Sequence, residues 1–547
     1  MTNPTAGIDA VDLGVMWDRL ISITDDIQTS IIRTSFSVAV REAMDLAVII
    51  FDRAGRSIAQ GTLSMPAFIG TAPYTMRHIL ARFPAETMRE GDVFATNDPW
   101  LGTGHTPDIC VARPVFRAGN LVGFVMTISH LPDIGGNGLA ISNTEIFQEG
   151  LVLLPCRLFD AGQREETMWD IIRLNVRSPD SVVGDIMADI SGTAVGERLL
   201  NELMADAGVD TLQPLANAII SHSEAAMQAE LRRLPTGTYT NELTIEGVAD
   251  DVALRCSVTI DNGRAHVDFA GTGPCVAEAI NVPLCYTRSF ANYVLKCLTT
   301  PDVPNNDGML LPVRIEAPHG CILNAMRPSS TGGRHTIGWF IVPLIMGALA
   351  KALPDRIAAD AGMASLCLVQ GTRPDGREMA EQYFLAGGLG AMRRLDGRAT
   401  TPFPTNNAVV STEVFEAETG ATVMHRRLLP DSGGAGEWRG GLGQEAALRN
   451  DTGHPFSVFL FGLRSRHAAR GLFGGKDGAL RSFMVDGQPI PAKGKSVLQP
   501  GQTLTVREAG GGGYGDPKKR APEAVRRDVA AGFVTAEAAL RDHGVTA

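Results

Sequence analysis

Two short segments of the chain share the pattern H-x-P-D, which places a histidine three residues before an aspartate. The first is His105-Thr-Pro-Asp108, and the second is His130-Leu-Pro-Asp133. Imidazole nitrogen and carboxylate oxygen suit a divalent ion such as Zn²⁺, Mn²⁺ or Fe²⁺. Two neutral imidazoles with one or two carboxylates would leave a position open for water or substrate, which is typical of a catalytic metal site.

The predicted strands around these segments favour a functional interpretation. We predict strands at residues 93–95 and 122–128, and each H-x-P-D segment lies on a glycine-rich loop that leaves a strand end. A single H-x-x-D pattern is usually a surface turn, but two at strand ends indicate a shared site. Asp45 precedes a further predicted strand at 46–52 and could complete the ligand set.

Helical and strand patterns alternate along the rest of the chain. Apolar residues from Leu13 to Ile31 recur at helical spacing, and the chain remains mostly helical from 163 to 232. After Pro235 the pattern changes to alternating strands. A helix from Thr336 to Leu353 contains Pro343, so we expect a kink there.

These patterns predict a mixed α/β (α+β) protein with several lobes. We expect a sheet-plus-helix metal-binding domain over residues 1–235 and a central α+β domain with an antiparallel β region over 236–400. The glycine-rich remainder, 401–547, is expected to contain short strands and a helical tail.

Composition narrows the class of protein further. The chain has 547 residues and a formal net charge of −11, with no block of Lys and Arg, which argues against a nucleic-acid partner. Its eight cysteines form no C-x-x-C pair and are expected to be buried thiols in a reducing compartment. The N-terminal stretch lacks a signal-peptide core, and no apolar run is long enough to cross a bilayer. We therefore expect a cytoplasmic protein with no membrane partner.

The glycine clusters do not form a recognised nucleotide site. They lie at 431–443, 471–475 and 510–515, and tight structural turns are the favoured interpretation over ligand loops. The sequence has no G-x-x-x-x-G-K-[ST] and no G-x-G-x-x-G between a clear strand and helix. It also has no G-x-S-x-G nucleophile elbow. We therefore expect this chain not to bind ATP.

The ordered set of motifs resembles the hydantoinase B family, which includes N-methylhydantoinase B, the caprolactamase beta subunit, the C-terminal half of 5-oxoprolinase and the acetone carboxylase alpha subunit. The resemblance runs from the opening helix to the tail. The motifs that carry it include Arg41-Glu42 with Asp45, Asn97-Asp98-Pro99, His105 to Asp108, Ser129 to Gly136, Glu145 to Gly150, Asp268 to Thr272, His467 to Gly475 and Gly510 to Pro517.

This resemblance implies a metal site and a partner. The family's metal ligands fall on His105, Asp108 and His130, with Asp45 as a further candidate. The partner would be an ATPase subunit of the hydantoinase A type, which phosphorylates the amide or ketone oxygen of the substrate. A water activated by the metal would then attack the carbon of a hydantoin or lactam. Asp133 and Glu149 are candidates for a general base or leaving-group contact, or for support of an imidazole.

Two alternatives remain open from the sequence. One is the alpha-type subunit of an ATP-dependent ketone carboxylase with the same metal, although the length of the chain favours ring opening. The other is a non-catalytic scaffold subunit with a structural metal. Arg334 and His335 lie where the family varies and could help to select the substrate.

Overall fold

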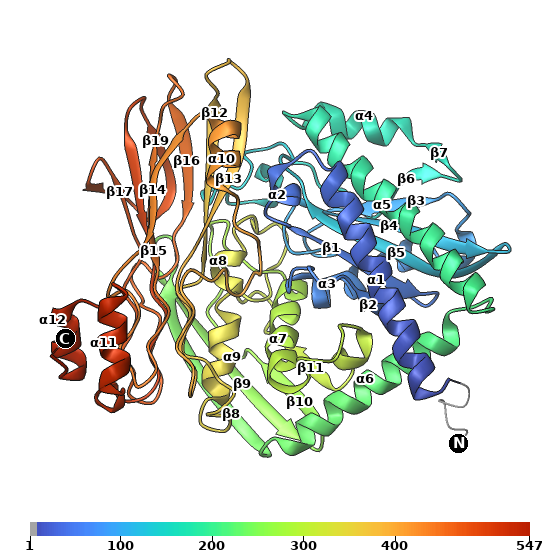
Figure 1. Cartoon of the computed structure of the whole chain (residues 1–547). Coiled ribbons are helices and arrows are strands. Elements are labelled where there is room, and N and C mark those ends of the chain that lie inside the picture. The colour runs from blue at the N-terminus through green and yellow to red at the C-terminus, as the bar shows by residue number, and fades with distance from the viewer. Residues whose placement is uncertain (1–7, 547) are drawn as a thin grey trace.

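A seven-stranded antiparallel sheet carries both H-x-P-D motifs in the computed structural model, which describes residues 8–546 (Figure 1). Residues 1–7, which begin the N-terminal stretch that is expected not to be a signal peptide, lie outside this range. The strand order is β2-β1-β5-β4-β3-β6-β7. The strands are β1 (Leu46–Asp52), β2 (Ser57–Gln60), β3 (Val93–Thr96), β4 (Asp108–Arg117), β5 (Asn120–His130), β6 (Cys156–Asp160) and β7 (Gln163–Arg164).

Side chains alternate between the two faces of this sheet, and each face is covered. Along β5, Phe124, Met126 and Ile128 join the core beneath α3 (Phe68–Arg82). Val125 faces the other way and packs in a second core with α1 (Ala10–Thr34) and α5 (Pro179–Asp206). This period of two follows from the pleat of a strand, and it decides which face the site residues share.

Helix α1 confirms the apolar stripe predicted between Leu13 and Ile31. The side chain of Asp9 caps its N-terminus by accepting hydrogen bonds from the backbone amides of Val11 and Asp12. The buried face of the helix lies against β1 and α5. Helices α2 (Val38–Arg41), α4 (Glu166–Asn175) and α6 (Gln213–Arg233) complete this part of the chain.

A four-stranded sheet and a helical layer follow. The sheet has the order β11-β10-β9-β8, formed by β8 (Gly237–Glu246), β9 (Asp251–Asp261), β10 (Arg264–Asp268) and β11 (Val313–Glu316). Asn262 and Gly263 turn the β9–β10 hairpin with positive φ angles of 44° and 75°, as the predicted hairpin requires. Helix α9 (Ile341–Leu349) packs on β8 and β9, and α7 (Leu284–Thr299) contacts both α9 and α3.

Two further sheets form the C-terminal part (Figure 1). One has the order β13-β12-β16-β19, formed by β12 (Ala364–Thr372), β13 (Glu378–Ala386), β16 (Phe456–Phe461) and β19 (Lys493–Leu498). The other has the order β14-β15-β20-β17-β18, formed by β14 (Thr422–Leu428), β15 (Gln444–Arg449), β17 (Ser482–Val485), β18 (Gln488–Pro489) and β20 (Thr503–Arg507). Helices α10 (Thr412–Thr419), α11 (Pro522–Ala530) and α12 (Ala536–Ala538) accompany them.

The observed elements agree with the predicted mixed α/β, multi-lobed class, and two local predictions need correction. Asp108 does not lie on a loop that leaves a strand, because it begins β4, a strand with Pro114 in its interior. The predicted kinked helix at 336–353 is two helices, α8 (His335–Gly338) and α9. Pro343 lies in the first turn of α9, where a missing N–H breaks no helical hydrogen bond.

The predicted division into three domains is not settled by these elements. Strands β12 and β13 precede the expected boundary near residue 400, yet β12 pairs with β16 beyond it. One hydrophobic core also includes buried residues from Val38 to Val506. Strand pairing and packing therefore cross the expected boundaries. Among residues 8–546, no helix combines the length and the apolar character that a bilayer span requires.

The C-terminal glycine clusters let backbone segments touch. A Cβ atom on Gly510 would lie 1.7 Å from the carbonyl oxygen of Ser432, and one on Gly512 would lie 2.1 Å from that of Arg470. No side chain fits into such contacts. The glycines at these positions therefore let the loops that follow β14, β16 and β20 pack directly against one another.

A buried ion pair fixes the start of β12. The guanidinium of Arg481 lies 2.6 Å from the carboxylate of Glu508, and both side chains are fully buried. The same guanidinium donates to the carbonyl oxygens of Gly362 and Met363, at 3.2 and 3.0 Å. Arg481 thus holds the segment that leads into β12.

We predict that Arg481→Met lowers the free energy of unfolding by about 3–5 kcal/mol, because it leaves the Glu508 carboxylate buried without a partner. Chemical denaturation would measure the loss, with Arg53→Met in an exposed turn as the control. The double variant Arg481→Met/Glu508→Gln should recover part of the stability. A single variant as stable as the wild type would contradict this role.

Candidate metal centre

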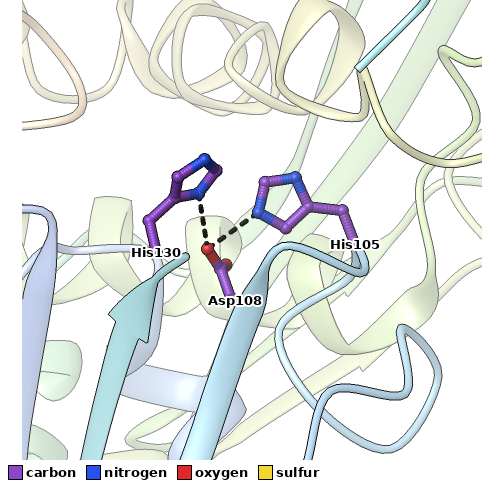
Figure 2. Close-up of side chains that lie close together, drawn as sticks. All are labelled: His105, Asp108 and His130. Carbon is purple, nitrogen blue, oxygen red and sulfur yellow. Dashed lines mark hydrogen bonds and ion pairs between the residues drawn. The ribbon is translucent and has the colours of Figure 1, made fainter. Parts of the chain in front are cut away.

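The two histidine segments meet at the ends of neighbouring strands (Figure 2). Asp108 begins β4 and His130 ends β5, and the strand register pairs them directly. Residues paired in this way lie on the same face. The Nδ1 atom of His130 is 3.0 Å from Oδ1 of Asp108, and Nε2 of His105 reaches the same oxygen at 2.8 Å. All three residues are buried, and their ligand atoms lie within 4.8 Å of one another.

Hydrogen bonds of Asn97 and a close contact at Gly104 fix the loop that carries His105. Asn97 donates from its side-chain amide to the carbonyl oxygens of Thr106 and Leu151, and its side-chain Oδ1 accepts from the backbone amide of Leu153. Gly104, just before His105, has a φ of 98°, and a Cβ there would lie 2.7 Å from a side-chain carbon of Arg334. Glycine is therefore required for this close approach.

Arg334 is the basic partner of Asp108. Its Nη2 donates to Oδ2 of Asp108 at 2.9 Å, and its Nε donates to the carbonyl oxygen of Thr103 at 2.9 Å. The guanidinium also lies over the ring of Tyr286, 4.2 Å from the ring centre. Asp108 thus presents one carboxylate oxygen to the two imidazoles and the other to the guanidinium of Arg334. From the sequence, Arg334 is expected only to help select the substrate, because its contact with Asp108 spans more than 200 residues of the chain.

The charges of the group match what a cation needs. Burial lowers the pKa of His105 to about 4, which keeps this imidazole neutral with a lone pair available. Burial alone would raise the pKa of Asp108, but His105 and Arg334 hold it well below its usual value, so the carboxylate is ionised. Burial also opposes protonation of His130, yet its hydrogen bond to Asp108 and the charge of Asp45 raise its pKa. A metal ion would compete with this proton.

Asp45 lies in the same cavity but outside the tight group. It precedes β1, and the backbone amide of His130 donates to its carbonyl oxygen at 3.2 Å. Burial raises the pKa of its carboxyl group to about 6.

The cavity has a volume of about 60 Å³. Around the four predicted ligands, its wall is mainly apolar and includes Met65, Phe68, Leu139, Tyr286, Trp339, Leu366 and Phe384.

Two further polar residues reach this cavity from distant parts of the chain. Gln382 on β13 places its carboxamide 3.0 Å from Nε2 of His130. His335 packs between the rings of Trp339 and Phe461, and its buried Nε2 has no hydrogen-bond partner within residues 8–546. No local pattern in the sequence marks Gln382, whereas Arg334 and His335 are candidates only because they lie where the family varies.

The two catalytic candidates from the sequence lie outside the cavity wall. Asp133 forms an ion pair with Arg177 at 3.0 Å and accepts from the amide of Gly135. Glu149 is buried, and its Oε1 accepts hydrogen bonds from Ser330 and from the backbone amides of Thr331 and Gly332. Neither carboxylate lines the cavity.

Glu149 is nevertheless linked to His105 through the backbone of Gly332. The carbonyl oxygen of Gly332 lies 3.3 Å from Nδ1 of His105. Such a contact fixes the tautomer of the ring, so that Nδ1 carries the proton and Nε2 faces Asp108. Because Glu149 holds the amide of Gly332, it helps to place the carbonyl that orients His105.

The donor set fits a divalent ion. The Nε2 of His105 is 2.8 Å from Asp108 but not aligned for a hydrogen bond, so this buried nitrogen lacks a partner within the described residues. Ligands about 2.1 Å from one ion and about 90° apart are roughly 3 Å from each other. The separations of 2.8 and 3.0 Å agree with that arrangement. A neutral imidazole, an ionised carboxylate and a second imidazole suit Zn²⁺, Mn²⁺ or Fe²⁺.

The chain is similar to known proteins in both sequence and fold. Residues 9–517 match the family described as hydantoinase B/oxoprolinase. The caprolactamase beta subunit of Pseudomonas jessenii is 30% identical, over 98% of this chain and 96% of that protein. The crystal structure of the ATP-dependent caprolactamase from the same organism superposes with a TM-score of 0.91 at 27% identity, over 99% of this chain and 97% of that chain.

A nucleotide-free structure of acetone carboxylase also shares the fold. It has a TM-score of 0.87 at 20% identity, and the match covers 97% of this chain and 79% of that chain.

We predict that the purified protein binds one divalent ion, and that His105→Ala or His130→Ala weakens this binding more than about a hundredfold. Outer contacts of a metal site cost about 10–100-fold when removed, so a direct ligand should cost more. Equilibrium dialysis with Zn²⁺ or Mn²⁺ would measure the affinity. His454→Ala, in an exposed loop, is the matched control. Equal affinity in all four proteins would rule out this metal centre.

Glu149→Ala should weaken metal binding by about 10–100-fold, since it releases the amides that place the Gly332 carbonyl against His105. Glu149→Gln retains an accepting oxygen and should lose less. Phe147→Ala alters an exposed residue of the same turn and should leave the affinity unchanged. If a folded Glu149→Ala variant binds metal like the wild type, the backbone holds Gly332 without the carboxylate.

Proposed function

The chain belongs to the hydantoinase B/oxoprolinase family, and from this premise we propose that it is the metal-dependent subunit of an ATP-dependent hydrolase that opens cyclic amides. The substrate class is a hydantoin or lactam. The observation that carries the proposal is the buried group of His105, Asp108 and His130 in one small cavity. In this proposal these three residues hold a divalent ion, and Asp45 is the candidate fourth ligand.

Amide bonds resist attack because their carbonyl carbon is a poor electrophile. Transfer of a phosphoryl group to the amide oxygen would create a better leaving group and a more reactive carbon. A divalent ion, when bound here, would supply Lewis-acid polarisation and lower the pKa of a water. The apolar wall of Phe68, Trp339 and Phe384 would exclude bulk water from the reacting carbon.

The residues around the ligands have defined roles in this proposal. Arg334 keeps Asp108 ionised and adds a positive charge beside the place where a phosphorylated substrate would sit. Asp45, whose pKa is raised to about 6, is able to take a proton near neutral pH if it does not bind the metal. Glu149 acts through Gly332 and His105 rather than on the substrate, and Asp133 holds the loop through Arg177.

We assign the phosphoryl transfer to a partner subunit of the hydantoinase A type. The sequence of this chain has no strict phosphate-binding loop. Its relative in Pseudomonas jessenii is named as a beta subunit, and the caprolactamase structure from that organism is described as ATP-dependent. The proposed enzyme is therefore a hetero-oligomer in which ATP and the metal act on different chains, and its expected location is the cytoplasm.

A ketone carboxylase is the second candidate, because the acetone carboxylase structure shares the fold. The cavity would then take a phosphorylated enol and carbon dioxide. A structural metal in a scaffold subunit is less compatible with the site, since structural zinc has a closed, often thiolate-rich, shell of four ligands. Among the described residues that line this cavity there is no cysteine.

The reconstituted complex with its ATPase partner distinguishes these candidates. We expect ATP-dependent opening of a hydantoin or lactam, with His130→Ala reducing the rate at least about a hundredfold and His454→Ala leaving it unchanged. Product analysis by mass spectrometry would measure it. Fixation of labelled bicarbonate without ring opening would favour the carboxylase. Full ring-opening activity in an assembled His130→Ala complex would leave only the scaffold role.

A further inference from the structure

A second hollow lies between α3 and α7, separate from the metal cavity. It has a volume of about 340 Å³, which is within the usual size of small-molecule sites. Tyr74 and Arg77 face it from one side of α3, three residues apart. Arg288 and Asn292 face it from α7, four residues apart. These spacings place each pair on a single helix face, so the two faces oppose each other across the hollow.

Four polar side chains of this hollow have no hydrogen-bond partner inside the described part of the protein. Within residues 8–546, those of Tyr74, Arg77, Arg288 and Asn292 make no hydrogen bond or ion pair, although all four line one hollow. The arginines that stabilise this fold behave differently, since Arg481 is buried against a carboxylate and several carbonyl oxygens. Arg77 is exposed and the other three side chains are half-buried, so their polar groups are available to a ligand that enters the hollow.

The charge of the hollow is opposite to that of the chain. The whole chain carries a formal net charge of −11, yet Arg77, Arg288 and Arg314 all line this space. Arg314 forms an ion pair with Glu316 at 2.5 Å. The one carboxyl group in the wall belongs to Asp307, which is buried, accepts from Ser57 at 3.1 Å and has its pKa raised by burial to about 6. The hollow therefore favours anions.

The hollow and the metal cavity share a wall. Gly70 and Cys285 line the hollow, while Phe68 and Tyr286, close to them in sequence, line the metal cavity. Ser289 fastens the two helices by donating to the carbonyl oxygen of Ala67 at 2.5 Å and accepting from the amide of Gly70 at 3.1 Å. The hollow is thus a separate site on the outer side of this wall.

We propose that this hollow binds the phosphoryl group of a small molecule. Two guanidinium groups on different helices, with a phenol and a carboxamide in the same lining, offer enough donors for the three free oxygens of a phosphoryl dianion. If the proposed function holds, the ligand is either the phosphorylated substrate or the inorganic phosphate that its cleavage releases. The anion site itself does not depend on the metal chemistry.

Isothermal titration calorimetry on the full chain tests this site with two probes, inorganic phosphate and phenyl phosphate. We expect saturable binding with one site per chain, and at least about tenfold weaker binding in Arg77→Gln/Arg288→Gln. Arg173→Gln, an exposed arginine on α4, should bind like the wild type. Tighter binding of phenyl phosphate would identify an organic phosphate as the ligand, and equal or tighter binding of phosphate would identify the free ion.

The His130→Ala variant separates this site from the metal centre. Phosphate binding that persists in this variant supports the hollow even if the metal chemistry proves wrong. Absence of saturable binding of both probes to folded wild-type protein would overturn the proposal. So would equal binding by the wild type and the double arginine variant, or loss of binding in His130→Ala alone.

Discussion

The direct pairing of Asp108 with His130 across β4 and β5 is the constraint on which the site depends. Side chains alternate between faces along a strand, so a shift of one residue in this register would turn one of the two groups to the opposite face. The antiparallel ladder keeps one register from Asp108↔His130 to Val115↔Gly123, and the register shifts only between Val115 and Phe116, next to the tight turn at Ala118 and Gly119. Cores on both faces of the sheet hold the ladder in place.

Burying the carboxylate of Asp108 requires compensation from distant segments. An ionised group in a medium of low dielectric constant is costly unless it is paired and hydrogen-bonded. Arg334, the residue before α8, supplies the charge, and its own position depends on Thr103 and Tyr286. Gln382 closes the site from the C-terminal sheet, whose β12 begins beside the buried pair of Arg481 and Glu508. The candidate metal centre therefore depends on the whole chain and not on the first sheet alone.

Sequence alone could predict the elements and the candidate ligands whose signals are local. The apolar stripe marked α1, the β-branched run marked β1, and the two H-x-P-D segments marked the histidines and Asp108. The strand β4 was missed because Pro114 interrupts a pattern that otherwise indicates a buried strand. Gln382 and the role of Arg334 could not be predicted, since only the fold brings these residues to His130 and Asp108. Glu149 was recognised as a candidate, but its contact with the backbone at Gly332 depends on the same long-range packing.

Anomalous X-ray diffraction at the absorption edge of the bound metal tests the central claim most directly. A single anomalous peak should lie about 2.0–2.2 Å from Nε2 of His105, an oxygen of Asp108 and a ring nitrogen of His130. A peak elsewhere in the molecule, with no peak between the two imidazoles and the carboxylate of Asp108, would contradict the account.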